Sequence, residues 1–253
     1  ALFVDLYANY FDPQLAEALV GILHRHGISV YVPPEQRIAG TPALLVGQME
    51  RFRRLAAHNT ALLADAVRQG YHIITPEPAA ALCLIHEYRG VLDDEDARLV
   101  ADHTSEATTY LWRLHTGGRL ELKFRPIQAN LGYHLPCRLR ALEVGSPGEN
   151  LLRLIPGLVV HRLEEGCSGM GCAFGLKREH YRISLRMGWG LISRLRAPEI
   201  QAGATECSAC KIQMEQGTTK PTLHPIKLLA YAYGLLPEVE ALLRHPGKEL
   251  LVT

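Results

Sequence analysis

The chain has 253 residues, of which 47% are hydrophobic and 21% charged, and its formal net charge is +1. This length allows two modest domains, or one large one, each with its own hydrophobic core. The balanced charge argues against broad electrostatic capture of nucleic acid, and no apolar run reaches the roughly 18 residues that a membrane span needs. No secretory signal pattern opens the sequence, so we expect a cytoplasmic protein, or one held peripherally at the inner membrane through its partners. Because the chain begins at Ala1, we also expect a processed protein or a piece of a longer one.

The first half alternates strand-like and helix-like segments. The helix predicted over 13–27 has the clearest boundaries, with Asp12 at the N-cap, Pro13 at the first helical position and Gly27 at its end. Strands are predicted over 2–7, 28–32 and 71–75, and further helices over 43–69, 79–88 and 95–115.

The second half repeats this order of elements. Strands are predicted over 131–136, 158–163 and near 200–206, and helices within 148–157 and over 178–196, 208–216 and 224–234. Alternating strands and helices favour parallel sheets. We therefore predict an α/β fold of two tandem pseudo-repeats, covering 1–125 and 126–253, each a small parallel sheet flanked by helices.

The two halves can also be aligned residue by residue, with an offset of 129 or 130. The aligned pairs are Ala8 with Cys137, Ile38 with Cys167, Glu77 with Cys207, and Ala80 with Cys210. The element order is thus duplicated but the thiols are not. This pattern predicts a degenerate first repeat without ligands and a second repeat that carries the site.

Five of the six cysteines lie in the second half, each in a turn where a predicted strand ends. They are Cys137, Cys167, Cys172, Cys207 and Cys210. Because the carboxyl ends of parallel strands face one crevice, we expect these turns to converge around one metal centre. The glycines around Cys167 and Cys172 suit such a centre, since they allow close backbone approach. The Cys207-x-x-Cys210 spacing alone is weak evidence, because redox pairs and zinc sites share it.

Four segments, HLPC, GCSGMGCAFGLK, TECSACKIQM and LHPIKLLAYAYGL, resemble the cysteine-rich (CCG) domain family. That family includes the B subunit of heterodisulfide reductase and the C subunit of anaerobic glycerol-3-phosphate dehydrogenase. The chain also resembles the C-terminal iron–sulfur part of FAD-linked oxidase fusions. The resemblance implies an electron-transfer module for a flavin-dependent oxidoreductase that acts on a 2-hydroxy acid or glycerol 3-phosphate. FAD would lie only on a partner or fused domain, and the acceptor would be a quinone, a ferredoxin or a disulfide.

The resemblance also implies which residues hold the cofactor. Cys137, Cys167, Cys207 and Cys210 match the metal-ligating thiols, and four thiols suffice for one [4Fe–4S] cluster or one zinc ion. Ser168 stands where the family has the second cysteine of a pair. Cys172 is either a further cofactor-binding or redox thiol, or a small buried residue of the turn.

Two other functions stay open at this point. The site could hold zinc in a structural or assembly module, or the Cys207/Cys210 pair, with Cys172, could carry out thiol–disulfide exchange. For the electron-transfer module itself we expect an oxidoreductase component that is not catalytic alone and needs no acid–base chemistry of its own.

Several other residues have a functional and a structural interpretation. For Cys83 we favour an apolar core position. For His134 we favour a hydrogen bond to backbone over a role at the cluster, and for His224 a helix cap or a role near the site. Lys177 and Lys211 are expected to be solvated, although each follows a thiol turn.

Overall fold

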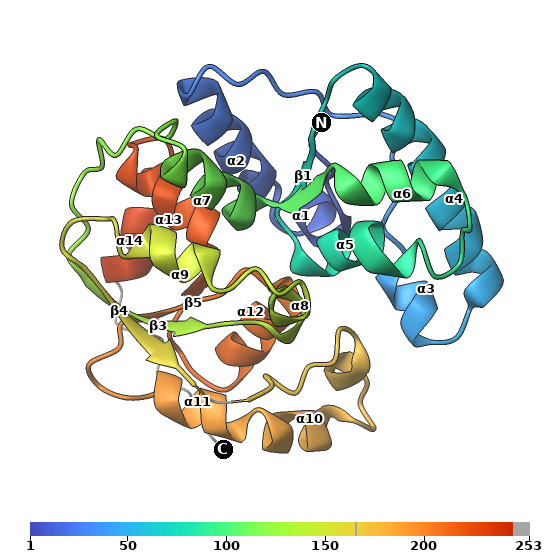
Figure 1. Cartoon of the computed structure of the whole chain (residues 1–253). Coiled ribbons are helices and arrows are strands. Elements are labelled where there is room, and N and C mark those ends of the chain that lie inside the picture. Colours follow the sequence, from blue (N-terminus) through green and yellow to red (C-terminus); the bar gives the residue numbers. More distant parts are fainter. Residues whose placement is uncertain (165, 245–253) are drawn as a thin grey trace. The chain divides into compact units, whose positions relative to one another are not determined.

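A computed structural model describes residues 1–164 and 166–244. Its contacts divide the chain into two compact units, the first of which ends at Leu120 and the second of which begins at Glu121 (Figure 1). In the part of the chain that the structure describes, no helix is both long enough and apolar enough to cross a bilayer.

The first unit is built around a small parallel sheet. Strand β1 (Ile73–Thr75) pairs with β2 (Thr104–Glu106), and Leu2 forms a bridge to Ile74. The helices around the sheet are α1 (Leu6–Tyr10), α2 (Pro13–Arg25), α3 (Thr41–Leu45), α4 (Met49–Arg68), α5 (Pro78–Leu82), α6 (Glu95–Asp102) and α7 (Ala107–Thr116). A π-helical turn, Cys83–Glu87, follows α5 directly. The core gathers apolar side chains from α3, α4, α6, β1 and this turn.

The second unit has a four-stranded, all-parallel sheet in the order β4-β3-β5-β6. Its strands are β3 (Ala129–His134), β4 (Leu158–Leu163), β5 (Ala202–Ala204) and β6 (Thr222–Leu223). Its helices are α8 (Cys137–Ala141), α9 (Pro147–Leu152), a 3-10 turn at Phe174–Leu176, α10 (Tyr181–Met187), α11 (Trp189–Leu195), α12 (Ser208–Gln216), α13 (Pro225–Ala232) and α14 (Val239–Arg244). In Figure 1, α11 lies on one side of this sheet, and α9 and α13 lie on the other.

Gly132 shows why α11 can pack so closely on the sheet. A Cβ at this position would lie 3.0–3.2 Å from the side chains of Leu163, Leu195 and Ile200. These apolar residues form one core cluster with Leu191 and Met214. They fill the space that a side chain at residue 132 would occupy. The cluster joins α11 and α12 to the face of the sheet.

Four segments of the first unit follow the same spatial order as the four strands of the second, and two small parallel sheets flanked by helices confirm the predicted tandem α/β architecture. In the first unit, Leu2 donates a backbone hydrogen bond to the Tyr31 carbonyl (2.8 Å) and bridges to β1 on its other side. The spatial order in the first unit is therefore the Tyr31 segment, the Leu2 segment, β1 and β2. It corresponds to the order β4, β3, β5 and β6 in the second unit. In both units, the first segment in the chain lies next to the third.

Four predicted elements were wrong in detail. The strand predicted over 2–7 is reduced to a single bridge at Leu2, because helix α1 already begins at Leu6. The segment predicted as a strand over 28–32 has no regular strand structure, and within the described residues its backbone bond to the sheet is the single Leu2–Tyr31 bond. The helix predicted over 95–115 is interrupted by strand β2, whose Glu106 side chain accepts hydrogen bonds from the first backbone N–H groups of α7. The helix predicted over 178–196 begins at Tyr181 and is divided at Gly188.

Candidate metal centre

The thiols of the second unit follow three neighbouring strands. Strand β3 ends at His134 and Cys137 is the first residue of α8, while β4 ends at Leu163, shortly before Cys167. Strand β5 ends at Ala204, and Cys207 is the N-cap residue of α12. Since β4, β3 and β5 are adjacent and parallel, all three turns lie at the same edge of the sheet.

The thiols of these turns are close enough to influence one another. Burial raises the pKa of the Cys137 thiol, and negative charge on Cys167 and Cys207 raises this pKa further. Negative charge on Cys137 in turn raises the pKa of Cys210. The structure thus brings Cys137, Cys167, Cys207 and Cys210 into one neighbourhood, as the strand-end argument requires.

Cys207 and Cys210 form the buried part of this cluster. The Cys210 thiol donates a hydrogen bond to Cys207, which lowers the pKa of the Cys207 thiol and raises that of Cys210. Backbone N–H groups of Ala209 and Cys210, at the start of α12, also lower the pKa of Cys207. This is the behaviour expected of a thiol at a helix N-terminus.

The remaining contacts come from the turn that carries Cys167. The Ser168 hydroxyl donates to the Cys210 sulfur (3.3 Å), and the Gly169 backbone N–H donates to the Cys167 sulfur (3.3 Å). Cys167 and Cys137 are exposed, whereas Cys207 and Cys210 are buried. One side of the cluster therefore faces solvent.

This donor set suits a soft or borderline metal. Thiolates are the preferred ligands of iron–sulfur clusters and of structural zinc. However, within residues 1–164 and 166–244, no three cysteine, histidine, aspartate or glutamate side chains are arranged as a ready metal site. Cys210 is instead hydrogen-bonded to Cys207 and to the Ser168 hydroxyl.

Cys172 lies in the same turn as Cys167, and its backbone is in the left-handed region with φ of 59°. A non-glycine residue rarely adopts this conformation, which costs about 1 kcal/mol or more. The side chain is half-buried. Its participation in the cluster stays a prediction.

The predictions for the two histidines had different outcomes. His224 caps α13, with its Nδ1 accepting a hydrogen bond from the Ile226 backbone N–H (3.1 Å). His134 is only 1% exposed, and neither of its ring nitrogens has a hydrogen-bond partner within the described residues. The expected bond from His134 to backbone is therefore wrong.

The two lysines that follow the thiol turns differ in exposure and in pairing. Lys177 is exposed, whereas Lys211 is partly buried and pairs with Glu215 on the next turn of α12. Sequence reasoning missed Arg138, whose positive charge lowers the pKa of both Cys137 and Cys207. The sequence feature that could have identified Arg138 is its position directly after Cys137.

The corresponding edge of the first unit holds a polar network in place of thiols. The Asp5 carboxylate accepts from the Ala39 backbone N–H (2.8 Å), and the Tyr88 hydroxyl donates to the Ala39 carbonyl (2.9 Å). The Asn59 side chain donates to the Tyr88 hydroxyl (3.0 Å) and to the carbonyls of Arg37 and Ile38. Side chains thus hold the turn that corresponds to the Cys167 turn.

Cys83 lies in the apolar core of the first unit, as expected, but its thiol is also hydrogen-bonded. It donates to Glu87 (2.6 Å) and lies 3.1 Å from the Thr41 hydroxyl. It is separate in sequence and in unit from the four clustered thiols.

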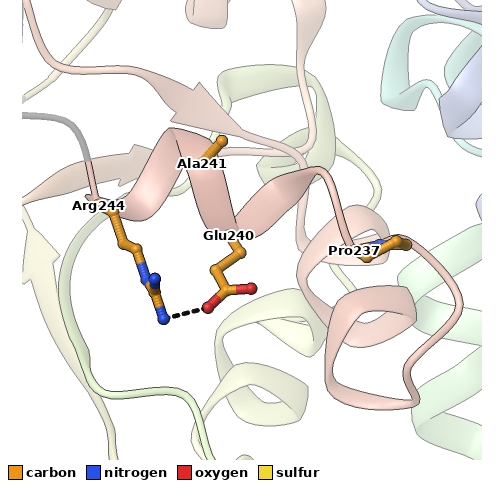
Figure 2. Close-up of a pocket in the computed structure, with 4 residues that line it drawn as sticks. All are labelled: Pro237, Glu240, Ala241 and Arg244. Atoms are coloured by element: carbon orange, nitrogen blue, oxygen red, sulfur yellow. Dashed lines mark ion pairs between the residues drawn. The ribbon is translucent and has the colours of Figure 1, made fainter.

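A cavity of about 380 Å³ lies elsewhere in the second unit, against α14 (Figure 2). It is lined by Pro237, Glu240, Ala241 and Arg244, and the last of these pairs with Glu240. None of the cysteines lines it, so we assign it no part in the thiol site.

Comparison with known proteins now adds to this geometry. The family described as "Cysteine-rich domain" (CCG) matches residues 6–85 and 131–215, one segment in each unit. The chain belongs to the cysteine-rich domain family. The second matched segment includes Cys137, Cys167, Cys172, Cys207 and Cys210, and the first contains the aligned positions that lack thiols.

Curated relatives of this cysteine-rich domain protein come from several redox systems. The C subunit of the anaerobic glycerol-3-phosphate dehydrogenase of Escherichia coli (strain K12) is 32% identical over 234 residues, which are 92% of this chain and 58% of that protein. The B subunit of the fumarate reductase (CoM/CoB) of Methanothermobacter marburgensis is 25% identical, over 90% of this chain and 44% of that protein. Lactate utilization protein A 2 of Bacillus mycoides is 29% identical, over 70% and 74% respectively. The chain thus spans little more than half the length of its glycerol-3-phosphate dehydrogenase relative.

Proposed function

We propose that the second unit holds one iron–sulfur cluster, of the [4Fe–4S] type, on Cys137, Cys167, Cys207 and Cys210. The observation that carries this proposal is that the four thiols lie in the turns after β3, β4 and β5, which are adjacent parallel strands. When bound, such a cluster supplies reversible one-electron transfer. The first unit, in this proposal, is a ligand-free repeat.

The chain's own residues would set the properties of this group. Cys207 and Cys210 are buried, whereas Cys137 and Cys167 leave one side of the site open to solvent. Arg138 and the N-terminal N–H groups of α12 favour the thiolate form of Cys207. The cluster would therefore have one protected side and one side from which electrons can leave.

The names of the relatives suggest the partners. We propose that an FAD-linked dehydrogenase, acting on glycerol 3-phosphate or a small 2-hydroxy acid, passes electrons to this chain. The chain then passes them to a quinone, a ferredoxin or a disulfide. We place it in the cytoplasm, with any membrane attachment made through its partners.

Metal analysis of anaerobically purified protein tests the proposal. We expect about four irons and four sulfides per chain, with visible colour. In Cys207→Ser both should be lost, because a buried thiolate is removed from the cluster. Cys83→Ser serves as the matched control, since its sulfur lies in the first unit, and it should retain the iron.

Two other outcomes would change the assignment. One zinc per chain, without iron and dependent on the same thiols, would support a structural zinc site instead. Neither metal in anaerobic protein, or equal iron content in Cys207→Ser, would overturn the proposal.

Thiol–disulfide exchange is a second candidate, favoured by the hydrogen-bonded Cys207/Cys210 pair at a helix start. Its difficulty is access, because Cys207 is 8% and Cys210 5% exposed, whereas reactive thiols are usually partly exposed. Reduction of one equivalent of a small disulfide by the isolated reduced chain, with Cys207 and Cys210 oxidised to a disulfide and the reaction lost in Cys207→Ser, would support it.

A further inference from the structure

The turn that carries Cys167 is pressed against the junction between α10 and α11. A Cβ at Gly188 would lie 2.1 Å from the Ser168 carbonyl oxygen, and one at Gly169 would lie 2.3 Å from the Ser184 carbonyl oxygen. Real Cβ atoms do not approach this closely, so both positions need glycine. The backbone of Ser168 is therefore held closely against this junction.

A buried pair of hydrogen bonds ties the same turn to α12. The Ser184 hydroxyl donates to the Gly169 carbonyl (2.9 Å), and the Gln213 amide donates to the Ser184 hydroxyl (3.2 Å). Ser184 is fully buried and Gln213 is 1% exposed. Gln213 lies three residues after Cys210, on the neighbouring position of the same helix face. The turn and the helix that bears Cys210 are thus held in a fixed relation without help from any thiol.

The Ser168 hydroxyl makes its bond to the Cys210 sulfur inside this frame. Ser168 is 2% exposed, Cys210 is 5% exposed and the oxygen–sulfur distance is 3.3 Å. Solvent does not compete for the hydroxyl at this depth, so the donor stays directed at the sulfur.

We infer that Ser168 is a positioning residue that donates a hydrogen bond to the Cys210 sulfur, and thereby tunes the potential of the cluster. The inference rests on the proposed function. A hydroxyl directed at a ligand sulfur stabilises negative charge there, and the reduced cluster carries one more negative charge than the oxidised one. The hydrogen bond therefore favours reduction. Ser184 and Gln213 support Ser168 by holding its turn against α12.

Ser168→Ala tests the inference on the anaerobic full chain. We expect unchanged iron and sulfide content, because no thiol is removed, and a midpoint potential shifted to more negative values. Resonance Raman spectra in H₂O and D₂O supply a second measurement. An iron–sulfur stretch that shifts on deuteration in the wild type should lose that shift in Ser168→Ala. Ser193→Ala, which removes an exposed hydroxyl from α11, should match the wild type in both measurements.

Ser184→Ala provides an independent variant if Ser168→Ala does not accumulate as folded protein. It leaves every thiol and Ser168 in place but frees the turn, so the potential should shift in the same direction by a smaller amount. If the site holds zinc instead, chelator competition should show about tenfold weaker zinc binding in Ser168→Ala.

The possible failures are distinguishable. A wild-type chain that binds neither iron nor zinc through Cys207 defeats the proposed function itself. A wild-type cluster whose potential and deuterium shift are the same in Ser168→Ala defeats only the role of Ser168. Loss of all iron in folded Ser168→Ala would also defeat the proposed role of Ser168 as a hydrogen-bond donor, because Ser168 would then be required as a ligand.

Discussion

At the scale of single residues, the turn at 37–39 and His134 differ in how buried polar groups are satisfied. In the first unit, the polar groups behind the turn at 37–39 are matched with one another through Asn59 and Tyr88. In the second unit, both ring nitrogens of His134 lack partners within the described residues. A matched network stabilises a fold, whereas an unmatched buried group costs free energy.

His134 should make the free energy of unfolding depend on pH. Burial, with a smaller contribution from Arg140, lowers the pKa of His134 from 6.5 to about 4. Between these values the unfolded chain binds a proton that the folded chain does not, so stability falls as the pH drops from about 6.5 to about 4. The loss should total about 3 kcal/mol. Denaturant titrations between pH 7 and 4 measure it.

His134→Gln is the matched variant for that titration. Glutamine does not titrate, so its free energy of unfolding should fall less over the same interval. Parallel curves for the two proteins would show that His134 is not the group responsible.

Asn59→Ala should destabilise the first unit strongly. Asn59 is fully buried, and its side-chain oxygen accepts a hydrogen bond from the Arg37 backbone N–H. Its amide group donates to the carbonyls of Arg37 and Ile38 and to the Tyr88 hydroxyl, and the substitution removes all of these bonds. We expect a loss of about 3 kcal/mol, since buried groups are left unpaired. Chemical denaturation followed by hydrogen exchange at 73–75 would measure it. Asn9→Ala, at an exposed position of α1, should change the free energy of unfolding by less than about 0.5 kcal/mol.

At the scale of elements, Gly188 explains why one predicted helix is two. The sequence pattern over 178–196 is continuous, but the Ser168 carbonyl occupies the space that a side chain at residue 188 would need. The contact involves residues twenty positions apart, so no local propensity encodes it. The helix divides where the thiol turn crosses it.

Gly188→Ala should therefore destabilise the second unit although alanine favours helices. The new Cβ would lie 2.1 Å from the Ser168 oxygen, so the turn must move, at a cost of about 2 kcal/mol. Iron content should fall together with the melting temperature. Gly190→Ala, at an exposed position of α11, should instead stabilise the helix by about 0.5 to 1 kcal/mol. A wild-type melting temperature in Gly188→Ala would contradict this view of the junction.

The elements that the sequence did not predict are short or polar. Strand β2 is Thr-Ser-Glu, and its three residues are buried without any apolar pattern. Strand β6 has only two residues. Both are strands because a neighbour pairs with them, which is information about the tertiary structure. By contrast, strand 158–163 and helix 208–216 have the boundaries that their patterns predict.

At the scale of the whole molecule, the convergence of the thiols was predictable because it depends only on topology. Parallel strands place their carboxyl ends together, so three turns with cysteines had to meet once β4, β3 and β5 were neighbours. The hydrogen bonds around them were not predictable. The Ser168–Cys210 contact and the influence of Arg138 depend on side-chain positions that spacing does not determine.

Removing the metal should affect the two units differently. A ligand that binds only the folded state stabilises it, and a cluster on the second unit would stabilise that unit directly. Chelation under air should therefore increase amide exchange in β3 and β5, while β1 keeps its protection. Hydrogen exchange with mass spectrometry of holo and stripped protein measures this. Equal loss of protection in β1 would contradict a first unit that is stable through its own side chains.

The spacing of the sulfur-bearing turns along the chain also has a consequence during synthesis. Cys137 and Cys167 are made well before Cys207 and Cys210, and the last strand of the sheet follows at Thr222–Leu223. A nascent polypeptide interrupted before Ser208 would lack the thiol of Cys210 and the helix that presents it. In the proposed site, a cluster with all four of its ligands could therefore form only after Cys210 has been made. Colour would then report that synthesis has passed Cys210.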